Sequence, residues 1–186
     1  MNYKFCALAM AVLLLAGCAV HEAVQSVPAG TEAVQSASST QRADREGRTE
    51  LAGVGDAALY STEGYSLYIP TEGWTLELES TGDIPHTTWT ADGQEGVTLT
   101  VYAYEDMSFM VARDRFASAS GYAFESGEGG RLGDPIQGSN GYGNVCGVMV
   151  AEGLEGVTYV IAWEYPEEGA WAETLRTIAD TFELTE

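Results

Sequence analysis

An alternating run at residues 97–104 constrains the fold of this chain more than any other stretch. Its apolar residues share one face of an extended strand, namely Val97, Leu99, Val101 and Ala103. Because successive side chains of a strand point to opposite faces, this pattern predicts a strand with that face in a core. The opposite face carries Thr98, Thr100, Tyr102 and Tyr104, so it is not fully polar. The run therefore predicts a layered fold in which both faces of the sheet are covered.

Shorter runs predict further strands on both sides of this one. Residues 65–69 and 74–78 flank Pro70 and a Thr-Glu-Gly turn, which predicts a hairpin with Trp74, Leu76 and Leu78 facing inward. Other strands are predicted at residues 87–90, 131–137, 142–151 and 157–165, and Pro166 ends the last one.

Two segments have helical periodicity. Ser108 is placed to cap a short helix, in which Phe109, Ala112 and Phe116 follow at helical spacing. Residues 167–180 predict an amphipathic helix with Glu167, Glu168 and Glu173 near its positive end, and its apolar stripe is Trp171, Leu175, Ile178, Ala179 and Phe182. This order of strands and helices predicts an α+β fold, an α/β/α sandwich with a central, mainly antiparallel sheet and helices packed on it.

Two stretches of residues 60–182 resemble PsbP-like domains. The similarity lies in Tyr65-Ser66-Leu67-Tyr68-Ile69-Pro70 with Trp74 beyond it, and in Tyr165-Pro166 before a helix that ends Ile178-Ala179-Asp180-Thr181-Phe182. The resemblance implies an α/β/α sandwich used chiefly for docking to other proteins, and it brings no catalytic residues. The basic docking surface of the photosynthetic members has no counterpart here, because the basic residues of positions 57–186 are only Arg113, Arg115, Arg131 and Arg176.

The first residues contain a processing signal. Lys4 is followed by an apolar run at residues 5–15, which is too short to span a bilayer, and small residues precede Cys18. Leu15-Ala16-Gly17-Cys18 resembles the lipobox of bacterial lipoproteins, which implies removal of residues 1–17 and lipid on the Cys18 sulfur. Several acyl chains on one cysteine make attachment effectively permanent. The alternative is an ordinary secretory signal cleaved near Ala19.

The composition changes near residue 57. Residues 19–56 are rich in Ala, Ser, Gln, Thr and Glu and contain no aromatic residue, which predicts that residues 18–56 are a lipidated cysteine and a disordered tether. Residues 57–186 then predict a single α+β domain. We expect this domain at the extracytoplasmic face of the cell membrane, or at the outer membrane where the envelope has two membranes.

The net charge excludes some partners. The chain carries 28 acidic and 8 basic residues, for a formal net charge of -20. Such a field opposes binding to nucleic-acid phosphates and anionic headgroups, since both require clustered Lys and Arg. We therefore expect no nucleic-acid partner, and contact with the membrane through the lipid on Cys18.

The domain offers little for catalysis. Its one histidine, His86, is interpreted as a surface loop residue, and no Gly-x-Ser-x-Gly motif occurs. Its one cysteine, Cys146, lies in an apolar run and is interpreted as a small buried hydrophobe. The acids at residues 92–95 and 105–106 lack the ligand alternation of a calcium loop. We predict no catalytic residue, cofactor or metal.

The remaining hypothesis is a binding surface, with Tyr102, Tyr104, Tyr122, Phe124 and Arg131 as its candidate residues. It predicts a membrane-anchored, non-catalytic binding module for another envelope protein. The alternative is a carboxylate-based glycan hydrolase or a glycan-binding protein of the envelope. A pocket with two acids and flanking aromatics would favour the hydrolase, and a filled sheet without a cleft would exclude it.

Overall fold

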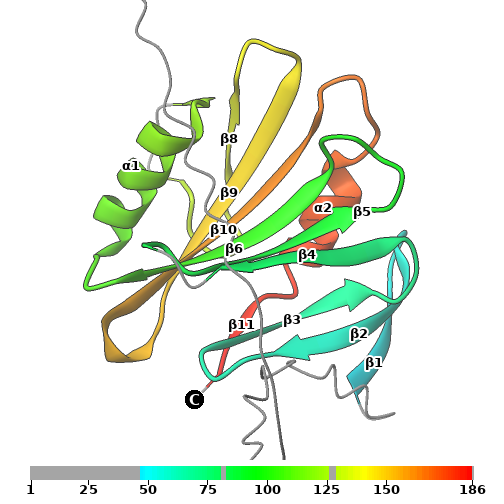
Figure 1. Cartoon of the computed structure of the whole chain (residues 1–186), viewed down its shortest axis with the longest axis horizontal. Coiled ribbons are helices and arrows are strands. Elements are labelled where there is room, and N and C mark those ends of the chain that lie inside the picture. Colours follow the sequence, from blue (N-terminus) through cyan, green and yellow to red (C-terminus); the bar gives the residue numbers. More distant parts are fainter. Residues whose placement is uncertain (1–46, 81–82, 126–128, 186) are drawn as a thin grey trace, which may run out of the picture. The chain divides into compact units, whose positions relative to one another are not determined.

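The computed structural model describes residues 47–80, 83–125 and 129–185, which contain two β-sheets and two α-helices (Figure 1). The predicted signal peptide, Cys18 and the tether before Gly47 lie outside the described residues. Neighbouring strands pair antiparallel in both sheets. The predicted α+β class, with mainly antiparallel sheet, is therefore confirmed.

The larger sheet is built around β10 (Val157–Pro166). This strand pairs with β6 (Thr98–Glu105) on one side and with β9 (Asn144–Glu152) on the other. The full order is β4-β5-β6-β10-β9-β8-β7, and the outer strands are β4 (Trp74–Ser80), β5 (His86–Ala91), β8 (Ile136–Ser139) and β7 (Ala123–Phe124). The edge strand predicted at residues 131–137 corresponds to β8, which begins later than expected. β8 is not at the edge of the sheet, because β7 pairs with it on the outer side.

The smaller sheet has the order β1-β2-β3-β11, with β1 (Arg48–Leu51), β2 (Gly55–Ser61), β3 (Tyr65–Pro70) and β11 (Glu183–Leu184). The predicted hairpin of residues 65–69 with 74–78 is wrong, because β3 pairs with β2 and β11, whereas β4 pairs with β5. Thr71 N–H donates to Asp56 O, and Gly73 O accepts from Asp92 N–H. The turn is thus bonded to one sheet at each end, and it carries the chain between the sheets.

The boundary predicted at residue 57 is too late. β1 lies in the segment interpreted as tether, yet it pairs with β2 from Arg48 opposite Ala58 to Leu51 opposite Gly55. Composition is misleading here because β1 is an edge strand whose residues are exposed or half-buried. Such a strand needs few apolar side chains.

Each face of the larger sheet has its own apolar cluster. One face packs against α1 (Phe109–Ser120) through Val148, Val150, Val160 and Ala162. The other packs against the smaller sheet and α2 (Ala172–Ala179) through Leu99, Ile161, Trp163, Leu67, Leu175 and Ile178. Both faces of β6 are covered, as predicted. The predicted helical layer holds for α1, whereas the opposite layer contains the smaller sheet as well as α2.

The predicted apolar residues of both helices are largely buried. The buried residues of α1 are Phe109, Ala112 and Phe116. The apolar stripe predicted for α2 is buried except for Trp171, which is half-buried. α2 begins at Ala172 rather than near residue 167.

The first turn of α1 is not capped by Ser108, contrary to the prediction from the sequence. The Ser108 side chain forms no capping hydrogen bond. Instead, Glu152 Oε1 accepts the N–H of Phe109 at 2.9 Å. A carboxylate at this position satisfies a free helix N–H and favours the positive end of the helix. The contact fixes α1 to the end of β9.

Candidate functional site

Strand register places two predicted binding residues on the α1 side of the larger sheet. Tyr102 on β6 lies opposite His86 on β5 and Val160 on β10. Tyr104 follows on the same face, opposite Thr158. Tyr104 lies near the end of β6, next to the connection from β6 to α1. The residues of this connection therefore lie close to Tyr104.

Four of the five predicted residues form one aromatic cluster with Phe116 of α1. Between ring centroids, Tyr102 lies 6.4 Å from Tyr104 and 5.4 Å from Phe116, and Phe124 lies 6.1 Å from Phe116 and 6.3 Å from Tyr122. However, Tyr104 is 3% exposed and Tyr122 is 8% exposed. The exposure expected for these two side chains is therefore wrong. Their rings are packed beneath α1, because burial of large aromatic area stabilises the fold.

Arg131 lies apart from this cluster. Its guanidinium carbon is 4.3 Å from the centroid of the Phe109 ring, and that of Arg113 is 5.8 Å from the same centroid. Two cations over one ring form cation–π contacts. They fix the chain around Arg131 to the first turn of α1.

On this face, Tyr122 and Cys146 both interact with the carboxylate of Glu164. The Tyr122 hydroxyl donates a hydrogen bond of 2.9 Å to Glu164 Oε2. Burial first, and then the Glu164 carboxylate, raise the pKa of the Cys146 thiol and of the Tyr122 hydroxyl. Cys146 therefore stays a thiol at neutral pH. It is buried, as predicted.

His86 is not a surface loop residue. It begins β5, is half-buried, and its ring lies 5.3 Å from the Tyr102 ring. Its Nδ1 lies 3.0 Å from Ile84 O. Within the described residues, no group of three His, Cys, Asp or Glu side chains is placed to hold a metal ion.

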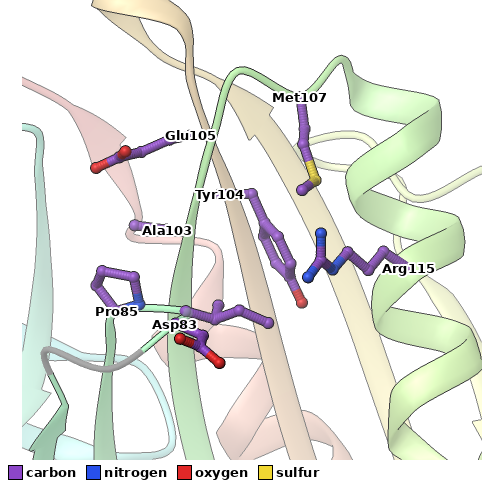
Figure 2. A pocket seen from close by; sticks show the side chains of 8 residues that line it. Asp83, Pro85, Ala103, Tyr104, Glu105, Met107 and Arg115 are labelled. Atoms are coloured by element: carbon purple, nitrogen blue, oxygen red, sulfur yellow. The ribbon is translucent and has the colours of Figure 1, made fainter.

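A pocket lies beside the connection from β6 to α1 (Figure 2). Its volume is about 310 Å³, and its lining residues are Asp83, Ile84, Pro85, Ala103, Tyr104, Glu105, Met107 and Arg115. Small-molecule sites span about 300–1,000 Å³, so this pocket suits a small group. In Figure 2 the Arg115 guanidinium and the Tyr104 hydroxyl extend to the same side, whereas Glu105 points away from them.

Arg115 differs from the other arginines of residues 57–186. Arg113 and Arg176 form ion pairs of 3.2 Å with Asp114 and 2.8 Å with Asp180, and Arg131 lies over Phe109. The Arg115 side chain forms no hydrogen bond or ion pair with any residue that the structure describes. Burial raises the pKa of Tyr104, and the nearby Arg115 charge opposes that rise. An unpaired guanidinium at a pocket is suited to binding a carboxylate or phosphate.

The connection from β6 to α1 also meets the hairpin between β9 and β10, which contains the turn η2 (Leu154–Gly156). We call the surface formed by residues 105–111 and 152–156 the α1 end. Asp106 N–H donates to Gly156 O at 2.9 Å, and Figure 1 shows the hairpin beside the start of α1. Asp106 and Glu155 have φ of 54° and 55°, a left-handed conformation that costs about 1–2 kcal/mol in a residue with a Cβ. Packing between the two loops holds them in one shape.

The α1 end combines apolar side chains with acids. Met110, Val111 and Leu154 are 50%, 53% and 65% exposed. The exposed acids of the same two segments are Glu105, Asp106, Glu152 and Glu155, and neither segment contains Lys or Arg. The two segments therefore expose apolar side chains and acids, and the guanidinium groups of Arg113 and Arg131 lie over the Phe109 ring in the same surface.

Comparison with known proteins found similarity only to solved structures. No protein-family model matches the chain, and no curated protein matches it. The cyanobacterial PsbP protein (CyanoP) of Synechocystis sp. PCC 6803 is 13% identical with a TM-score of 0.47, covering 69% of this chain and 92% of that chain. A protein of Bacteroides thetaiotaomicron is 11% identical with a TM-score of 0.42, covering 66% of this chain and 45% of that chain. Neither likeness identifies a site or a function here.

One finding bears on the membrane. Among the helices of the described residues, none is long and apolar enough to cross a bilayer.

Sequence reasoning identified Tyr104 but missed Asp83, Met107 and Arg115 as pocket residues. The loop with Asp83 is placed there by pairing of β5 with β6, since Ala103 N–H donates to Pro85 O at 2.8 Å. The scarcity of basic residues was the one available signal for Arg115. Whether an arginine is paired depends on its neighbours in space.

Proposed function

We propose that the protein is a membrane-anchored extracytoplasmic lipoprotein whose domain is a non-catalytic binding module, and that another envelope protein binds at the α1 end. The anchor is the lipid on Cys18, and the tether precedes the domain. We further propose that the fold is PsbP-like, on the basis of the motifs at residues 65–70 and 165–182. The observation that carries the binding role is the exposed apolar group of Met110, Val111 and Leu154.

Physical features of the α1 end suit recognition. Burial of exposed apolar area stabilises a complex, and a surface already held in one shape loses little conformational entropy on binding. The exposed acids of the two segments favour a partner with basic residues around its contact surface and speed the encounter with it. The partner is therefore expected to present an apolar patch surrounded by Lys or Arg.

Photo-crosslinking in cells tests the surface. A photoreactive residue at position 110 or 154 is expected to trap the same partner, whereas one at Tyr142 is not. Tyr142 is a matched control because it is 90% exposed and lies beyond the other end of β9. The double change Met110→Ser and Leu154→Ser should weaken capture about tenfold or more, and Tyr142→Ser should not. Equal trapping from all three positions would contradict the proposal.

A separate experiment tests the anchor. Cys18→Ala is expected to abolish lipid labelling and to leave the signal uncut or the protein mislocalised. Metabolic labelling with a fatty acid, followed by mass spectrometry of the mature N-terminus, measures this. An unlipidated N-terminus in the parent protein with unchanged membrane retention would contradict it.

The carboxylate-based glycan hydrolase is the second candidate. The pocket is lined by Asp83, Glu105 and Tyr104, a combination of two acids and an aromatic that favours it. Glu105 points away from the other polar groups, which favours binding over catalysis. Release of reducing ends from purified peptidoglycan would establish the hydrolase if Asp83→Asn and Glu105→Gln each abolished it.

A further inference from the structure

Opposite charges line the pocket without pairing. Arg115 and Asp83 both contribute to its wall, and they form no ion pair with each other. Both side chains are exposed. Each charge is therefore open to a ligand in the pocket.

The rest of the wall defines the ligand further. Ile84, Pro85, Ala103 and Met107 provide apolar contact. Tyr104 places a hydroxyl on the side of Arg115, where it can donate a hydrogen bond. A ligand thus meets a positive side, a negative side and an apolar wall within about 310 Å³.

We propose that this pocket binds a small zwitterion with an α-amino carboxylate head group, as in a free neutral amino acid. The carboxylate contacts Arg115 and the Tyr104 hydroxyl, the ammonium group contacts Asp83, and the apolar side chain packs against Ile84 and Met107. A simple anion is disfavoured by Asp83, and a simple cation is disfavoured by Arg115. A zwitterion satisfies both charges at once. This site adjoins the protein contact at the α1 end and shares Glu105 and Met107 with it.

Calorimetric titration of the full-length protein in detergent tests the proposal. The first panel contains both enantiomers of leucine, methionine and valine. For the amino acid that binds best, two analogues follow: the amide, which lacks the carboxylate, and the deamino acid, which lacks the ammonium group. Each analogue is expected to bind about tenfold more weakly or worse, because it leaves one charged group of the pocket without its partner.

Two variants assign each end of the ligand. Arg115→Gln should weaken binding of the amino acid about tenfold and should not weaken binding of its amide, because that cation is disfavoured by the guanidinium. Asp83→Asn should weaken binding of the amino acid by a similar factor and should not weaken binding of the deamino acid, because that anion is disfavoured by the carboxylate. Arg176→Gln is the matched control, because Arg176 is paired with Asp180 outside the pocket, and it should bind like the parent. Circular dichroism checks that each variant is folded.

Three results would overturn the proposal. They are no binding by any amino acid of the panel, equal affinity of the parent for the amino acid and its two analogues, and an equal loss for all three ligands in Arg115→Gln. Photo-crosslinking at position 110 is measured in the same variants. It is expected to persist, so failure of the pocket is distinguishable from failure of the protein contact.

Discussion

At the scale of single residues, close packing makes Gly147 indispensable. Gly147 on β9 lies opposite Trp163 on β10. A Cβ at position 147 would overlap the Trp163 indole ring. Glycine is therefore required because the ring lies against the backbone, whereas its φ is one that other residues also adopt.

Gly147→Ala is expected to destabilise the domain by about 1–3 kcal/mol, the usual cost of overpacking a core. Urea unfolding measures the free energy. Trp163→Phe should cost less in the Gly147→Ala background than in the parent, because the smaller ring relieves the overlap. Ser118→Ala, at an exposed position of α1, is the control. An unchanged unfolding free energy for Gly147→Ala would mean that the ring lies elsewhere.

Buried tyrosines make stability depend on alkaline pH. Burial first, and then the Glu164 charge, raise the pKa of Tyr102 to about 12, from about 10 in an unfolded chain. Between about pH 10 and 12 the unfolded chain loses this proton while the folded domain keeps it. The free energy of unfolding therefore falls as the pH rises through this window, and the contribution is fully present below it.

Tyr102→Phe is expected to make this alkaline decline shallower, because it removes one ionisable group with a raised pKa. Urea unfolding at several values between about pH 8 and 12 measures the decline. Tyr142→Phe is the control, since Tyr142 is 90% exposed. A decline of equal slope in the parent and in Tyr102→Phe would show that Tyr102 ionises alike in both states.

At the scale of elements, α2 and the residues after it close the second core. Phe182 is 5% exposed, and its ring lies 5.4 Å from Tyr65 and 6.0 Å from Tyr159. Trp171 precedes α2 and is half-buried, with its ring 6.3 Å from Trp74. The two aromatics of the predicted stripe are therefore not equivalent.

Phe182→Ala is expected to cost about 3–5 kcal/mol, because it leaves a cavity between β3 and β10. Trp171→Ala should cost less, since part of that side chain is already in water. Chemical unfolding of both variants gives the comparison. An equal cost for both, or a cost below about 1 kcal/mol for Phe182→Ala, would mean that α2 is not packed as described.

At the scale of the whole molecule, both ends of the described chain belong to the smaller sheet. β1 pairs with β2 at one end, and β11 pairs with β3 at the other. Thr185 N–H also donates to Gly64 O at 3.2 Å. The domain therefore includes ten residues, 47–56, that composition assigned to the tether.

A chain that begins at residue 47 is expected to be more stable than one that begins at residue 57, because only the longer chain retains β1. Thermal unfolding of the two truncations measures the difference. Limited proteolysis of the full chain should cut before Gly47 and spare residues 47–80. Early cuts within β1 or β2, or equal stability of the two truncations, would contradict this boundary.

Periodicity in the sequence was enough to predict the elements with a recognisable buried face, namely β5, β6, β9, β10 and α1. The apolar run around Cys146 was enough to predict its burial, and the lipobox predicts the anchor at Cys18. The tertiary structure was needed to show that β3 leaves β4 for another sheet and that Tyr104 and Tyr122 lie beneath α1. It was also needed to show that the Arg115 side chain pairs with no residue that the structure describes and lines a pocket with Asp83. The physical reason is that periodicity specifies that a face is buried, whereas the group that covers it comes from residues distant in the sequence.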